Sequence, residues 1–254
     1  MVKTRRELML EEMGLTPVWR LRGPALAPEG DAAARAENGV LDEASKISGN
    51  RSPVTDSGDR RAEIMGLDWV ALKGRVASCT DCALHQKRNK TVFGVGDENA
   101  DWLFVGEGPG ADEDAQGEPF VGQAGRLLDN MLAAIQLRRG QNVYIANCVK
   151  CRPPGNRNPE PGELHACEPY LQRQIELIQP KLIVALGRVA VQNLLATDAS
   201  ISSLRGRIHQ YRGIALIVTY HPAYLLRSLP DKAKAWADLC FAVRVMGDLQ
   251  NRES

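Results

Sequence analysis

Four short apolar runs constrain the fold of this chain more than any other feature of its sequence. They are residues 102–105, 143–145, 182–186 and 215–219. Their apolar residues are continuous rather than alternating, which is typical of strands covered on both faces of a parallel sheet. A segment with apolar residues at helical spacing follows each run. The alternation predicts an α/β fold, with a four-stranded parallel sheet flanked by helices on both faces.

The chain divides into three parts by composition. Residues 1–22 are predicted to form an N-terminal helical extension, in which Leu8 and Met13 belong to an apolar stripe. Residues 23–62 carry few large apolar side chains and are interpreted as a disordered linker, and residues 63–254 as the folded domain. Two interpretations of the extension stay open: a surface element without a partner, or a docking helix for a partner protein.

Length and composition exclude several classes of protein. The 254 residues, 44% of them hydrophobic, suit one globular domain with an appendage, and a net charge of +1 does not indicate a nucleic-acid partner. No apolar run approaches the roughly 18–20 residues that cross a membrane, and Glu7, Glu11 and Glu12 argue against a signal peptide. We therefore expect a cytoplasmic monomer with no membrane partner. In the cytoplasm, cysteines are expected to bind a metal or a cluster or to lie in the core, and the chain has six of them. Cys148 and Cys240 are assigned to the core.

The other four cysteines form two pairs. Cys79 and Cys82 make a C-x-x-C motif, while Cys151 and Cys167 flank a loop rich in proline and glycine. The two pairs predict a four-thiolate site for zinc or a [4Fe–4S] cluster. The long spacing of the second pair is atypical of a zinc ribbon and favours iron–sulfur; the alternative is four buried small hydrophobic residues. A metal centre here would pin both ends of the loop, which is a structural role.

Polar residues follow three of the four runs. Glu107 lies in a loop rich in glycine and proline after the first run, Asn147 ends the second, and His221 follows the fourth. Because the carboxyl ends of parallel strands share one edge of a sheet, ligands bind there in open α/β folds. The sequence therefore predicts a site at which a carboxylate, an amide and an imidazole meet.

Four segments carry a resemblance to a known family. They are GEGPGADEDAQGEPFVGQAGRLLD, YIANCVKCRPPGNRNPEPGELHAC, LIVALGRVAVQNLL and LRGRIHQYRGIALIVTYHPAYLLR. In this order they resemble the family 4 uracil-DNA glycosylases, over about residues 67 to 249. The resemblance implies a [4Fe–4S] cluster held by Cys79, Cys82, Cys151 and Cys167. It also implies monofunctional excision of uracil from DNA, which leaves an abasic site. No lysine in these motifs is placed to form a Schiff base, so strand cleavage is not expected.

The resemblance assigns roles to four residues. Phe120 would stack under a uracil flipped out of the DNA, and Asn147 would read the N3–H and O4 groups of that base. His221 would donate to uracil O2 as negative charge develops there. Glu107 would orient the attacking water or stabilise an oxocarbenium-like sugar.

The glycine-rich loop departs from the best-known branch of the wider superfamily, which carries a G-Q-D-P-Y motif. Gly108 stands in place of the aspartate that positions water, and Glu107 in place of the glutamine. Glu107 is the first choice to compensate, with Glu113 and Asp114 as alternatives. Gly110 replaces the tyrosine that excludes thymine, a task for which Glu113 is the candidate.

Basic residues gather around the predicted site. They are Lys87, Arg88, Lys90, Lys150, Arg152, Arg157, Arg205, Arg207, Arg212 and Arg227. Of these, Arg152, Arg157 and Arg227 are the predicted DNA-binding residues, because cations near phosphates suit an enzyme that follows DNA. Leu225, between Tyr224 and Leu226, is the predicted wedge that fills the gap left by the flipped base.

Two rival functions stay open. One is a superfamily relative that crosslinks to abasic DNA through a reactive histidine in a basic insert; here the corresponding region has only His165, within a predicted helix. The other is a non-enzymatic, iron–sulfur nucleic-acid-binding or docking module. In that case Glu107→Gln and His221→Ala would leave function intact, whereas in an enzyme both would abolish turnover.

Overall fold

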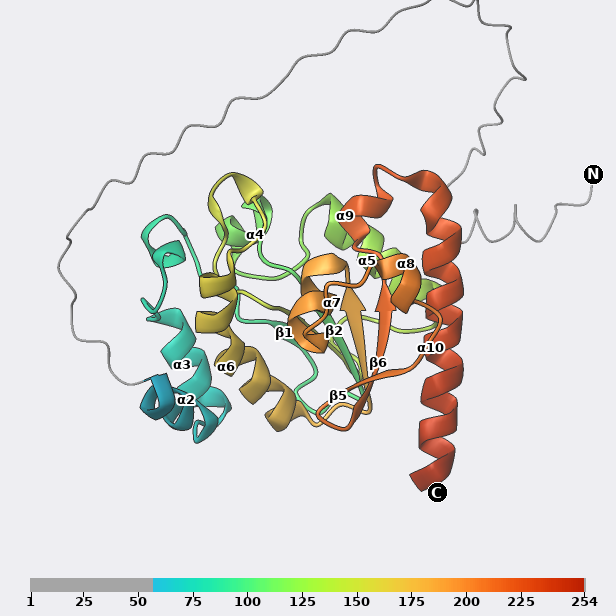
Figure 1. Cartoon of the computed structure of the whole chain (residues 1–254), viewed down its shortest axis with the longest axis horizontal. Coiled ribbons are helices and arrows are strands. Elements are labelled where there is room, and N and C mark those ends of the chain that lie inside the picture. Colours follow the sequence, from blue (N-terminus) through green and yellow to red (C-terminus); the bar gives the residue numbers. More distant parts are fainter. Residues whose placement is uncertain (1–56, 254) are drawn as a thin grey trace, which may run out of the picture. The chain divides into compact units, whose positions relative to one another are not determined.

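The computed structural model describes residues 57–253. The predicted N-terminal helix (1–22) and residues 23–56 of the predicted linker lie outside the described residues. The described part forms one sheet of strands in the order β1-β3-β2-β4-β6-β5, with helices packed against it (Figure 1). The helices are α2 (Ser57–Met65), α3 (Trp69–Ala77), α4 (Ala111–Gln116), α5 (Gln123–Ala134), α6 (Pro161–Ile178), α7 (Arg188–Leu195), α8 (Ile201–Leu204), α9 (Pro222–Leu225) and α10 (Lys232–Glu253).

The four predicted strands form the centre of the sheet. Strands β3 (Val143–Asn147), β2 (Trp102–Gly106), β4 (Leu182–Leu186) and β6 (Ile214–Thr219) pair in parallel, in that order. Every residue of β2, β3 and β4 is buried, which explains their continuous apolar character. The pairing aligns Gly106 with Asn147, so the residues that follow β2 and β3 leave the sheet side by side.

Two edge strands were not predicted, and the sheet is therefore mixed rather than purely parallel. Strand β1 (Val95–Gly96) pairs antiparallel with β3, and β5 (His209–Tyr211) pairs antiparallel with β6. Both are two or three residues long and lack buried residues, so they leave no periodic pattern in the sequence.

Helices cover both faces of the sheet, as predicted. On one face, residues of α6 and α7, among them Leu171 and Val191, pack against β2 and β4. On the other face, residues of α5 and α10, among them Leu128 and Val245, pack against the same strands. Because the helices pack on the two faces of the sheet, the loops at its carboxyl edge are available for chemistry. None of the described helices is long and apolar enough to cross a membrane.

The predicted linker extends too far into the folded domain. Residues 57–62 belong to helix α2, where Arg60 pairs with Asp81 (2.8 Å) and Arg61 with Glu168 (3.5 Å). Ile64 of the same helix is fully buried. These partners lie far away along the chain, so a local pattern of composition could not show that the segment is folded.

Candidate active site

A cavity of about 440 Å³ opens at the carboxyl edge of the sheet, beyond the ends of β2, β3 and β6. It brings together eight of the predicted site residues: Glu107, Gly108, Glu113, Phe120, Asn147, Arg157, His221 and Arg227. Arg152 and Leu225 do not line it. The remaining lining residues are Pro109, Gly110, Ala124, Pro153, Asn156, Asn158, Ala223 and Tyr224.

Glu107 is the first residue after β2 and presents its carboxylate to the cavity. Its backbone carbonyl accepts the N–H of Val149 (3.2 Å), which ties the loop to the chain that leaves β3. No donor among the described residues contacts the carboxylate itself. Burial raises the pKa of Glu107 above its ordinary value of 4.5. A half-buried carboxylate without a protein partner is suited to bind water or to face a developing positive charge.

Glu113 and Asp114 use their oxygens to hold the glycine-rich loop. Glu113 accepts backbone N–H groups from Gly110 (3.0 Å), Val121 (3.0 Å) and Gly122 (3.2 Å). Asp114 is fully buried, does not line the cavity, and accepts the backbone N–H (2.8 Å) and the side-chain amide (2.6 Å) of Asn89. Asp114 as the water-orienting carboxylate is therefore wrong. Glu113 is occupied by the loop, and its exclusion of thymine stays a prediction.

The ring of Phe120 forms a wall of the cavity. Its centroid lies 5.5 Å from that of the His221 ring, at an interplanar angle of 31°. The backbone of Phe120 has φ of +56°, a strained conformation for a residue with a side chain. Arg139 holds this turn, because its guanidinium donates to the carbonyls of Pro119 and Phe120, both at 2.8 Å. The ring is thus fixed by the surrounding chain.

Asn147 ends β3 and is 2% exposed. Its Oδ1 atom is buried and has no hydrogen-bond partner among the described residues. Gly106 on the neighbouring strand leaves room for it: a Cβ there would lie 2.5 Å from Oδ1 and 2.6 Å from Cζ of Phe120. Buried acceptors are seldom left unpaired, because the loss of hydration is costly. The geometry therefore marks Oδ1 as the acceptor for a donor group of a ligand.

His221 follows β6, and its hydrogen bonds define the tautomer of its ring. Nδ1 accepts the backbone N–H of Ala223 (3.1 Å), so the proton of a neutral imidazole resides on Nε2. Burial lowers the pKa of His221 to about 4; Glu113 opposes this shift and Arg227 adds to it. Gly187 permits the close approach of this turn, because a Cβ there would lie 2.6 Å from that of His221. The site thus holds a neutral N–H donor.

The loop between β3 and α6 supplies a wall of the cavity that sequence reasoning missed. Pro153, Asn156 and Asn158 line the cavity from this loop. Arg157 also lines it, but its guanidinium makes a bidentate pair with Glu163 (2.7 and 2.8 Å) and so holds the loop. The signal in the sequence is the proline- and asparagine-rich composition between Cys151 and Cys167, which indicates an irregular loop but not that it lines the cavity.

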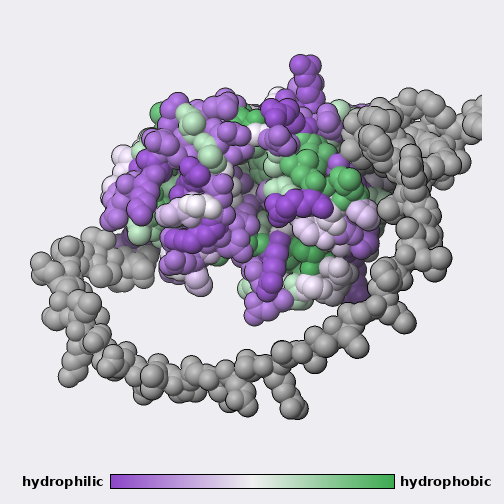
Figure 2. All heavy atoms as spheres, turned by 90° about the horizontal axis from the view of Figure 1, so that it is seen from above, coloured by the Kyte–Doolittle hydropathy of each residue, from purple (hydrophilic) through white to green (hydrophobic). Residues whose placement is uncertain are grey.

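One predicted DNA contact, Leu225, and two of the basic residues near the site need correction. Leu225 is fully buried among residues of α5 and α10, so it is not the wedge; its neighbours Tyr224 and Leu226 are each 38% exposed. Lys150 is 1% exposed, and Arg88 donates to Cys151 Sγ (3.1 Å). Neither cation is presented to DNA. Figure 2 looks onto the carboxyl edge of the sheet, where an apolar area interrupts a mostly hydrophilic face.

The structure brings the four predicted metal ligands to one small cavity. Cys79 and Cys82 come from the loop after α3, Cys151 from the loop after β3 and Cys167 from α6. Burial raises the pKa of all four thiols, to about 12 for Cys167. In the described part of the chain, no three His, Cys, Asp or Glu side chains form a group that could hold a single metal ion.

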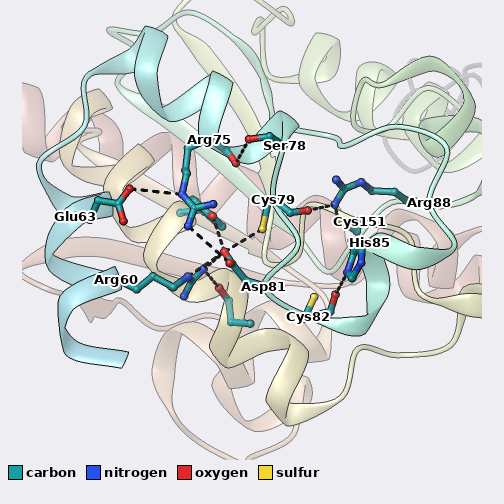
Figure 3. A network of polar contacts seen from close by, with 12 residues as sticks. Arg60, Glu63, Arg75, Ser78, Cys79, Asp81, Cys82, His85, Arg88 and Cys151 are labelled. Atoms are coloured by element: carbon teal, nitrogen blue, oxygen red, sulfur yellow. Dashed lines mark hydrogen bonds and ion pairs between the residues drawn. The ribbon is translucent and has the colours of Figure 1, made fainter. Parts of the chain in front are cut away.

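Asp81, between the first two cysteines, is the centre of a polar network (Figure 3). Its Oδ2 atom accepts from Arg60 Nε (2.9 Å), Tyr170 OH (2.8 Å) and Cys79 Sγ (3.1 Å). Burial alone would raise the pKa of Asp81, but the hydrogen bonds from Cys79, Tyr170 and Arg60 lower it. The carboxylate therefore joins α2 and α6 to the loop that carries the first cysteine pair.

Substitution of Asp81 tests how much this polar network contributes to the stability of the protein. We expect Asp81→Asn to lower the free energy of unfolding by about 1.5–3 kcal/mol, since hydrogen bonds to a charged group are lost. Chemical denaturation monitored by circular dichroism measures the change. Asp59→Asn, which removes a carboxylate from α2 that pairs with no described residue, is the control. Equal midpoints for the two variants would contradict the assignment.

Comparison with known proteins gives one consistent result. The sequence model of the Uracil DNA glycosylase superfamily matches residues 93–240, a range that contains every residue lining the active-site cavity. The type-4 uracil-DNA glycosylase of Archaeoglobus fulgidus is 48% identical over 159 residues, which cover 59% of this chain and 79% of that protein. The enzyme of the same name from Thermotoga maritima is 48% identical over 176 residues, covering 68% and 89%. That from Sulfurisphaera tokodaii is 45% identical over 163 residues, covering 61% and 74%.

Proposed function

Since the chain belongs to the uracil-DNA glycosylase superfamily, we propose that it hydrolyses the N-glycosidic bond of deoxyuridine in DNA, leaving free uracil and an abasic site. The observation that carries the proposal is the buried Oδ1 of Asn147, which no described residue pairs with. It lies in a cavity that also presents the N–H of a neutral His221 and the carboxylate of Glu107. These three groups supply base recognition, leaving-group stabilisation and help for the attacking water.

Base recognition rests on complementary hydrogen bonds. Uracil N3–H would donate to Oδ1 of Asn147, and the amide N–H₂ would donate to uracil O4. Cytosine carries an acceptor at position 3 and an amine at position 4, so it would leave both groups of the amide mismatched. The ring of Phe120 would stack on the extruded base, an interaction that contributes about 1–3 kcal/mol. The base must leave the DNA helix to reach these groups.

The chemical step assigns one task to each remaining group. The Nε2–H of His221 would donate to uracil O2 as the base departs as an anion, with the imidazole neutral throughout. Glu107 would hold the water that attacks the sugar carbon, or stabilise its positive charge. No lysine is among the described residues that line the cavity. This supports direct hydrolysis, without a Schiff base and without strand cleavage.

The surface around the cavity would hold DNA. Arg227 lines the cavity with no carboxylate partner among the described residues, and Arg152 lies at the start of the loop that walls it. Both are proposed phosphate contacts. Tyr224 and Leu226 replace Leu225 as candidates for the apolar wedge, because both are exposed beside His221. Arg157 is committed to Glu163 and would act by holding the loop.

We further propose that Cys79, Cys82, Cys151 and Cys167 hold a [4Fe–4S] cluster. The cavity that these thiols line also contains Arg88 and Lys150, whose positive charges suit an anionic centre. Such a centre would join the ends of the loop that carries Pro153, Asn156 and Asn158, and would therefore keep one wall of the active site in place. A brown protein whose colour bleaches on oxidation would support this assignment.

The crosslinking alternative finds little support. Its reactive histidine would have to face the cavity, whereas His165 lies on α6 with a side chain that is 77% exposed and does not line the cavity. A denaturing gel after incubation with uracil-containing DNA distinguishes the two functions. A stable protein–DNA band would indicate crosslinking; release of uracil without it would indicate hydrolysis.

Release of uracil from a labelled oligonucleotide tests the proposed function, and Asn147→Ala tests its central observation. We expect the wild-type protein to excise uracil and not cytosine. In Asn147→Ala the preference for uracil should fall by about 1–3 kcal/mol, or roughly 5- to 150-fold, because a bidentate contact to the base edge is lost. Asn99→Ala, at an exposed asparagine outside the cavity, is the control. If the wild-type protein released no uracil, the proposed function would be wrong.

A further inference from the structure

The side chain of Lys150 lies between the active site and the cysteine cavity. It is 1% exposed. Its Nζ atom donates to the backbone carbonyl of Asn147 (2.9 Å) and to Oε1 of Gln174 (2.6 Å). The same residue lines the cavity formed by the four cysteines. One buried ammonium group therefore contacts the residue that reads the base and faces the site that would hold the metal centre.

The charge of this ammonium group has no carboxylate partner among the described residues. Both of its hydrogen-bond acceptors are neutral, and Gln174 is itself oriented by a hydrogen bond from Nε2 to the carbonyl of Phe93 (2.9 Å). The thiols of Cys151 and Cys167 line the same cavity as Lys150. An uncompensated charge in a protein interior is costly. Thiolates that bind a metal centre are deprotonated, so a loaded site would supply the missing negative charge.

We infer that Lys150 is a positioning residue that couples the metal centre to the base-recognition residue. With the four cysteines as charged ligands, the ammonium group is compensated on one side and donates to the carbonyl of Asn147 on the other. That hydrogen bond holds the end of β3 so that Oδ1 of Asn147 faces the cavity. The inference rests on the proposed function, since it takes both the cluster and uracil recognition as given. It adds a second role for the cluster. Besides holding the loop between Cys151 and Cys167, the cluster affects recognition of uracil through Lys150.

The test uses full-length protein loaded with iron and sulfide, and the variant Lys150→Met, which keeps length and removes charge. Three quantities are measured: iron and sulfide per chain, the reduction potential of the cluster, and the Kd for free uracil. We expect a more negative reduction potential, because a positive charge next to an anionic centre is lost. We also expect the Kd for uracil to rise about tenfold, because the anchor of Asn147 is removed.

Lys87→Met is the matched control, since Lys87 is an exposed lysine that follows the first cysteine pair. It should leave the Kd for uracil unchanged and move the potential less than Lys150→Met does. If loaded Lys150→Met shows the potential and the uracil affinity of the wild type, the inference is wrong. If the wild type itself binds no iron, the cluster proposal fails, and if it releases no uracil from DNA, the proposed function fails, before the variants are considered.

A second variant covers the case in which Lys150→Met does not fold or load. Gln174→Glu places a carboxylate at the acceptor that already contacts Lys150, with almost no change of shape. The ammonium group thereby gains a permanent partner. The variant also loses the hydrogen bond from Nε2 to the carbonyl of Phe93, a loss that is common to loaded and metal-free protein, so the coupling is measured as the difference between the two forms. The difference in unfolding midpoint between loaded and metal-free protein should shrink accordingly. An unchanged difference would overturn the coupling.

Discussion

Replacement of His221 by alanine should lower kcat for uracil release by about 10²–10³-fold, the usual loss when one donor to a developing negative charge is removed. The reason is that Nε2–H is the one N–H donor of the neutral ring, because Nδ1 already accepts the backbone N–H of Ala223. Binding of uracil-containing DNA should be nearly unchanged, because the donor acts mainly as the base departs. Single-turnover kinetics with a labelled oligonucleotide separate the two effects.

The pH dependence sharpens this expectation. The pKa of His221 is lowered to about 4 by burial, so the ring is neutral at pH 7 and stays neutral as the pH falls to 5. His221 should therefore contribute no loss of rate between pH 7 and 5. His209→Ala is the control, since His209 lies on edge strand β5 and does not line the cavity. A wild-type rate that fell with a pKa near 6.5, and did so only while His221 was present, would contradict the neutral-donor role.

Replacement of Glu107 by glutamine should lower kcat by about 10²–10⁴-fold, the range for a positioned acid–base group. Its carboxylate has no protein partner in the described structure, so the amide would keep the shape of the site and lose only the charge. Folding should be unaffected, and circular dichroism checks this. Glu118→Gln, at an exposed position of the same loop, is the control.

The rate should also report the titration of Glu107. The carboxylate must be ionised to act, and burial raises its pKa above the ordinary 4.5. Activity should therefore be full well above this pKa and decline as the pH falls through it, whereas the residual activity of Glu107→Gln should lack that decline. If Glu113→Gln removed the decline and Glu107→Gln kept it, the water-orienting carboxylate would be Glu113, despite its three backbone contacts.

The sequence by itself determined the class of fold and the edge of the sheet that carries the site. Continuous apolar runs can be buried only in a sheet that is covered on both faces, and parallel strands must end together. Residue type and position at a strand end then predicted that Glu107, Asn147 and His221 meet, and all three line one cavity. The same local reasoning selected the four cysteines that surround the second cavity.

Only the tertiary structure decided which way individual side chains face. Leu225 and its neighbours Tyr224 and Leu226 are all large side chains, and packing against α5 and α10 buries the first and leaves the other two exposed. Lys150 is indistinguishable from a surface lysine in the sequence, yet contacts with Asn147 and Gln174 place it in the interior. Orientation depends on the neighbours that fill the surrounding space, and those neighbours are distant along the chain. The same holds for the side-chain oxygen of Asn147, since only the packed structure shows that none of the residues it describes supplies a donor to that oxygen.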